Sequence, residues 1–189
     1  MTTSRLEAFS DGVLAIIITI MVLELKAPVD TDLNSLLAKT PVFISYIFSF
    51  IYVGIYWNNH HHLFQITEKV NGKILWANLH LLFWLSLIPF TTAWIGENYK
   101  NLLPVMAYGV VLLFCAIAYF ILQAIIIKFH DDQFALKQVI GSDRKGKVSM
   151  ALYLLGIASA FIFPWVGLIF YGIVAIMWLV PDRRIETKV

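Results

Sequence analysis

Charged residues are scarce in this sequence: they make up 14% of its 189 residues and gather in short clusters between long apolar runs. Soluble domains carry about 25% charged residues, so this scarcity excludes an ordinary soluble fold. Hydrophobic residues make up 60% of the chain, and they do not alternate with polar ones as barrel strands would. Because only helices and closed barrels satisfy backbone polar groups in lipid, the composition predicts an all-α polytopic protein in a lipid bilayer.

Patterns typical of catalysis are absent as well. The sequence contains no nucleophile elbow, Walker loop or metalloprotease motif, and 189 residues leave little room beyond a bundle of membrane helices. The single cysteine, Cys115, excludes an intramolecular disulfide and is expected to be a small packing residue. A net charge of +2 gives no reason to expect nucleic-acid binding. We therefore expect neither an enzyme nor a cofactor.

The apolar runs predict six membrane-spanning helices in a single domain that covers 1–189. A helix needs about 20 apolar residues to cross a bilayer. The last apolar run, 148–180, is too long for one helix, and Pro164 within it favours a turn between two short helices. The alternative is five helices, of which the last is kinked and tilted. The six predicted helices cover 5–25, 42–63, 74–96, 102–128, 148–162 and 165–180.

Lysine and arginine are distributed unevenly between the two ends of these helices. With six helices, eleven basic residues share the side of both termini and three lie on the other side. The positive-inside rule then places both termini in the cytoplasm and the protein in the cell (inner) membrane. The eleven are Arg5, Lys69, Lys73, Lys128, Lys137, Arg144, Lys145, Lys147, Arg183, Arg184 and Lys188, and the three are Lys26, Lys39 and Lys100.

The first predicted helix has one continuous apolar face. On a helical wheel with about 100° per residue, Thr19, Ile20 and Leu23 fall within about 60° of Ile16. This face consists of bulky apolar groups with a single hydroxyl. This pattern would suit contact with lipid or with a partner helix.

Asp11 lies in the same helix, about 140° from Ile16. A charge inside a membrane span is costly, so its presence predicts a functional or structural site. Since a buried carboxylate needs hydrogen-bond donors, we expect Asp11 and Ser10 to be buried in a polar cluster with neighbouring helices. The candidate partners are residues 58–62 in the second helix and Trp76, Asn78 and His80 in the third.

The run His60-His61-His62 invites comparison with a metal site. Adjacent residues of a helix point in different directions, so the three imidazoles cannot chelate one ion together. No cysteine or second carboxylate cluster accompanies them. We expect no metal site, and one of these imidazoles to join the Asp11 cluster.

Two motifs resemble the transmembrane protein 175 family, the lysosomal potassium channels and their bacterial homologues. The first is Arg5-x-x-x-Phe9-Ser10-Asp11 at the start of the first helix. The second runs from Trp76-Ala-Asn78-Leu-His80 to Trp94 in the third helix. A single six-helix unit is similar to the bacterial members of the family, whereas the animal channels fuse two such units.

The resemblance implies a potassium-permeable homo-tetramer whose first helices line a central pore. It implies that Ile16, five residues after the motif aspartate, forms the narrowest apolar ring, and that Ile20 and Leu23 form rings further out. The hydroxyl of Thr19 would be the one polar group of this lining. Arg5, Phe9, Ser10 and Asp11 would hold the pore helix in place rather than bind the ion. The Thr-Val-Gly-Tyr-Gly loop of the usual potassium filter is absent from the sequence.

Two other functions remain open on the sequence alone. A secondary transporter could use Asp11 as a proton or cation site, although the inverted repeats and broken helices of such proteins are not evident. A membrane protein with a structural or assembly role is the third possibility. Glu24, near the outer end of the first helix, could attract cations or could lie at the lipid interface.

Overall fold

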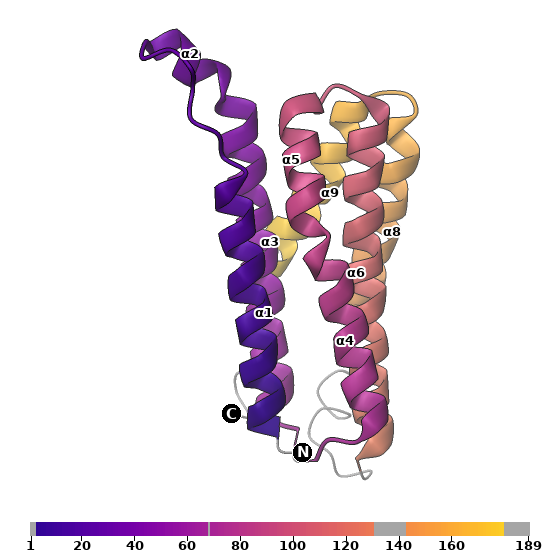
Figure 1. Cartoon of the computed structure of the whole chain (residues 1–189). Coiled ribbons are helices and arrows are strands. Elements are labelled where there is room, and N and C mark those ends of the chain that lie inside the picture. Colours follow the sequence, from indigo (N-terminus) through magenta and orange to yellow (C-terminus); the bar gives the residue numbers. More distant parts are fainter. Residues whose placement is uncertain (1–2, 68, 131–142, 180–189) are drawn as a thin grey trace.

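The chain folds into an all-helical, elongated bundle (Figure 1). The structure, a computed structural model, describes residues 3–67, 69–130 and 143–179. Four segments are long and apolar enough to cross a membrane: 3–23, 40–65, 72–98 and 102–129. The described helices are α1 (Thr3–Leu23), α2 (Leu33–Ala38), α3 (Thr40–Gln65), α4 (Gly72–Ser86), α5 (Ile88–Asn98), α6 (Leu102–Phe129), α8 (Arg144–Ala160) and α9 (Pro164–Leu179).

Capping residues fix where several of these helices begin. The side chain of Asp32 accepts a hydrogen bond from the backbone N–H of Ser35 and so starts α2. This bond is the main reason why the pKa of the exposed Asp32 carboxyl is lowered. Asn71 and Asp143 cap α4 and α8 in the same way.

The third predicted helix, 74–96, is two helices in the structure. α4 ends at Ser86, Leu87 lies between the helices, and α5 begins at Ile88 with Pro89 in its first turn. Proline has no N–H with which to continue the ladder of α4, and its ring clashes with the preceding turn. The segment therefore changes direction at this point, yet together α4 and α5 remain long enough for one membrane span.

The last two helices are short and pack closely. α8 and α9 are separated by residues 161–163, and α9 begins at Pro164, near the predicted turn. A Cβ added to Gly167 of α9 would lie 2.8 Å from the carbonyl oxygen of Gly156 in α8. Glycine at this crossing thus lets the two backbones touch. Residues 131–142, between α6 and α8, lie outside the described residues.

Three buried hydroxyl groups in the bundle interior satisfy one another. Thr92 of α5 donates to the hydroxyl of Ser49 in α3 at 2.7 Å, and that hydroxyl is 2.9 Å from the Tyr108 hydroxyl of α6. All three residues are buried. Their contacts join three helices at a depth where an unpaired hydroxyl would be costly.

Candidate functional site

α1 packs against the rest of the protomer through one face only. Its buried residues recur at intervals of three or four, which is the spacing of a single helical face. This face contacts α3, α4 and α5, and α1 stands at the side of the bundle in Figure 1. The buried residues of α1 are Leu6, Ser10, Leu14, Ile17 and Met21.

The opposite face of α1 has no partner in the protomer. Ile16 is 60% exposed, Ile20 43% and Leu23 74%, and Thr19 between them is exposed as well. Phe9 continues the same stripe toward the start of the helix, and it is 50% exposed. Ile16, Thr19, Ile20 and Leu23 are the side chains that the sequence placed on one apolar face, so α1 presents a bulky stripe away from its own protomer.

The hydroxyl of Thr19 is oriented by its own helix. It donates a hydrogen bond of 2.8 Å to the carbonyl oxygen of Ala15. A hydroxyl oxygen that donates its proton still has lone pairs that can accept a proton or contact a cation. Thr19 therefore offers one fixed oxygen ligand in an otherwise apolar stripe.

A buried polar cluster joins α1 to α3 and α4. Ser10 is fully buried and donates to the carbonyl oxygen of Leu6. Its oxygen accepts a bond of 2.9 Å from the side-chain amide of Asn78 in α4. The amide oxygen of Asn78 is in turn 2.8 Å from Nε2 of His60 in α3. The three side chains thus fix the start of α1 against two neighbouring helices.

Asp11 is not part of this buried cluster, contrary to the expectation from the sequence. Its side chain is exposed in the protomer, and it accepts a hydrogen bond of 3.0 Å from the indole N–H of Trp57 in α3. The reason is angular: adjacent residues differ by about 100° around a helix, so only one of Ser10 and Asp11 can face the interior. The smaller, uncharged hydroxyl takes that position at lower desolvation cost.

The other expected partners lie elsewhere. Trp76 is 75% exposed, and His80 accepts a hydrogen bond from Trp84 on its own helix. Asn78 is therefore the one third-helix candidate that reaches the motif, and it bonds Ser10 rather than Asp11. The other motif residues, Arg5 and Phe9, are exposed in the protomer. In the described part of the chain, no group of three or more His, Cys, Asp or Glu side chains could hold a metal ion.

A second contact between α1 and α3 was not predicted from the sequence. Nδ1 of His61 lies 3.5 Å from the Glu7 carboxylate, and its ring stacks on Trp57 at a centroid distance of 6.3 Å. Glu7 and Asp11 are four residues apart, as are Trp57 and His61. The sequence signal for this contact is a pair of side chains four residues apart in each of the two facing helices.

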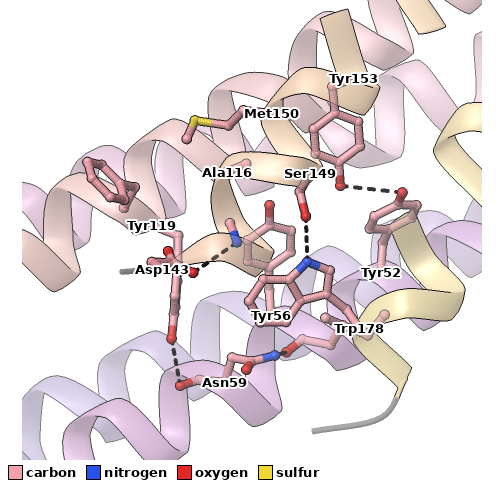
Figure 2. Close-up of a pocket in the computed structure, with 13 residues that line it drawn as sticks. Tyr52, Tyr56, Asn59, Ala116, Tyr119, Asp143, Ser149, Met150, Tyr153 and Trp178 are labelled. Atoms are coloured by element: carbon pink, nitrogen blue, oxygen red, sulfur yellow. Dashed lines mark hydrogen bonds between the residues drawn. The ribbon is translucent and has the colours of Figure 1, made fainter. Parts of the chain in front are cut away.

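The interior also contains a small cavity among α3, α6, α8 and α9 (Figure 2). Its wall is largely aromatic, and the indole N–H of Trp178 donates to Ser149 at its edge. The cavity measures about 40 Å³. Ligand pockets typically measure about 300–1,000 Å³, so this space could hold water but not a metabolite. It involves none of the α1 residues.

The chain is similar to known membrane proteins over its whole length. The model of a family described as "Endosomal/lysosomal potassium channel TMEM175" matches residues 5–89. A potassium channel of Chryseobacterium sp. (strain P1-3) is 59% identical over 98% of this chain and 97% of its own. A potassium channel of Chamaesiphon minutus is 39% identical over half of each chain.

A solved structure shows the same fold. The crystal structure of a lysosomal potassium-selective channel TMEM175 homolog from Chamaesiphon minutus matches with a TM-score of 0.82. The match covers 95% of this chain and 97% of that one, with 27% sequence identity.

Proposed function

The chain belongs to the endosomal/lysosomal potassium channel TMEM175 family, and from this premise we propose that it forms a potassium-permeable channel in the cell membrane. The resemblance carried by the Arg5-to-Asp11 motif is confirmed by this membership, as is the expectation that the chain is not an enzyme. The relatives that are named potassium channels support the choice of ion.

The observation that carries the proposal is the unpartnered apolar stripe of α1. A helix packed on one side leaves Ile16, Ile20 and Leu23 facing away from its own protomer. One such stripe cannot enclose a pore, so several copies must surround a common axis. We take the number four from the family resemblance. In this assembly α1 of each subunit lines the pore, and the pore forms only when the copies come together.

Six spans per subunit are part of the proposal. α1, α3, α6, α8 and α9 would each provide one, and α4 and α5 together would provide another. This arrangement, in a single domain, places both termini on one side. The positive-inside rule assigns that side to the cytoplasm, because most basic residues lie there. The proposed location is the cell (inner) membrane.

An apolar ring controls permeation by dewetting, because a narrow apolar constriction excludes water. When the ring is narrow it is dry, and an ion passes only if the ring widens or the ion sheds water. Potassium loses its hydration shell more readily than sodium, so a ring of Ile16 side chains favours potassium. The fixed oxygen of Thr19, one turn further along, replaces part of the lost hydration.

Ion flux from reconstituted vesicles tests the function directly. The proposal predicts fast, voltage-driven potassium flux from vesicles that contain the purified protein. Slow, saturable exchange coupled to protons would instead indicate the transporter with Asp11 as its site. No flux of either kind would favour a structural role.

The substitution Ile16→Asn tests the constriction. A polar amide should wet the ring, so we expect a higher potassium conductance and weaker discrimination between potassium and sodium. The matched control is Ile18→Asn, because Ile18 is partly buried and lies off the stripe. It should impair folding but leave permeation nearly unchanged in the channels that assemble. Equal effects at the two positions would show that the pore face is misassigned.

A further inference from the structure

A large groove lies between the start of α4 and the end of α6, two helix ends that are neighbours at the lower end of Figure 1. Its volume is about 1,010 Å³, close to the upper end of the size range of ligand sites. The groove is separate from the apolar stripe of α1. It is lined by residues of both helices, including Lys73, Trp76, Ile121, Ile125 and Lys128.

One end of the groove is positively charged. Lys73 lies in the first turn of α4 and Lys128 in the last turn of α6, and both are exposed. Within the described ranges, neither ammonium group has a carboxylate at ion-pair distance. Two cationic groups thus flank the same opening without an anionic partner from those residues.

The rest of the groove is largely apolar, and Asn71 and His80 are its other polar side chains. Ile121 and Ile125 precede Lys128 by seven and three residues, so they lie about 10 Å and 5 Å from it along the axis of α6. Trp76 stands one turn after Lys73, and 75% of its surface is exposed. The groove therefore changes from cationic at the end of the bundle to apolar toward its middle, with an indole at the boundary.

We propose that this groove binds an anionic phospholipid, with the phosphate between Lys73 and Lys128 and an acyl chain along Ile121 and Ile125. The inference rests on the proposed membrane orientation, which places this end at the cytoplasmic leaflet, where basic pockets between helices bind anionic headgroups. A zwitterionic lipid carries no net charge to balance the two ammonium groups. The hydrophobic helix of a partner protein would leave both lysines without an anion.

Lipid binding to the purified protein tests the charged end. Native mass spectrometry in detergent should show tighter binding of palmitoyl-oleoyl phosphatidylglycerol than of the matching phosphatidylcholine. Each basic residue near a membrane surface contributes about 1 kcal/mol, so the double variant Lys73→Gln, Lys128→Gln should bind phosphatidylglycerol roughly 30-fold more weakly. The control variant Lys39→Gln, Lys100→Gln removes the same charge from the other end and should bind as the wild type does.

Fluorescence tests the apolar part and the alternative occupants. Phosphatidylglycerol with brominated acyl chains should quench wild-type tryptophan emission, and Trp76→Phe should remove part of this quenching. Absence of that difference would show that another segment or a second copy covers the groove. Equal binding of the two lipids, or equal affinity of the double variant and the wild type, would also overturn the proposal. Each of these results is independent of potassium flux, which tests the channel itself.

Discussion

Ser10 and Asp11 are neighbours in the sequence but have different surroundings. Ser10 is buried against Asn78, whereas Asp11 is exposed in the protomer and accepts a hydrogen bond from Trp57. Both contacts hold α1 against another helix, and neither side chain belongs to the Ile16 stripe. In the proposed channel, Ser10 and Asp11 would therefore hold α1 in position rather than contact the ion.

Substitution of Asp11 tests whether this residue holds α1 in position or contacts the permeating ion. Asp11→Ala leaves the Trp57 indole without its acceptor, and we expect it to destabilise the assembled protein by about 1 kcal/mol. Asp11→Asn keeps an acceptor oxygen and should therefore lose less stability than Asp11→Ala. Thermal unfolding and native mass in detergent measure both effects. Normal tetramers of Asp11→Ala with altered ion preference would contradict the holding role.

The contact between α8 and α9 depends on glycine. An alanine Cβ at Gly167 would meet the backbone oxygen of Gly156, which cannot move without displacing α8. We expect Gly167→Ala to destabilise the protein by about 1–3 kcal/mol in detergent unfolding experiments.

Gly172 of α9 provides the matched control for this contact. A Cβ there would lie 3.9 Å from the ring of Phe48, an ordinary van der Waals distance. Gly172→Ala should be neutral, or stabilising by up to about 1 kcal/mol, because alanine favours the helix. Equal destabilisation by the two substitutions would show that close approach at Gly167 does not matter.

Sequence periodicity located the helices more reliably than it located their partners. Long apolar runs with basic residues at their ends gave spans close to those of α1, α3 and α6. A proline in such a run is compatible with either a kink or a break, so the division at Pro89 needed the structure. A helical wheel gives angles within one helix but not the directions of its neighbours. It could therefore find the Ile16 stripe and still assign Asp11, as well as Ser10, to the interior.

At the scale of the whole molecule, the proposed pore requires an assembly, because one stripe of α1 cannot enclose it. Native mass spectrometry of the detergent-solubilised protein should give the mass of four 21.6 kDa chains. Fourfold symmetry then brings four copies of Ile16 around one axis. A monomeric or dimeric mass, in a preparation that still conducts potassium after reconstitution, would contradict the tetramer.

The most direct measurement of the central claim is the accessibility of single cysteines on α1 during potassium flux. The native thiol of Cys115 is fully buried, so the wild-type chain provides a background without an accessible cysteine. A charged methanethiosulfonate reagent should block flux through channels with cysteine at Ile16, Thr19, Ile20 or Leu23. It should leave flux unchanged with cysteine at Ile17 or Met21, which face the protomer interior. Block at the interior positions, or no block along the stripe, would show that α1 does not line the pore through this face.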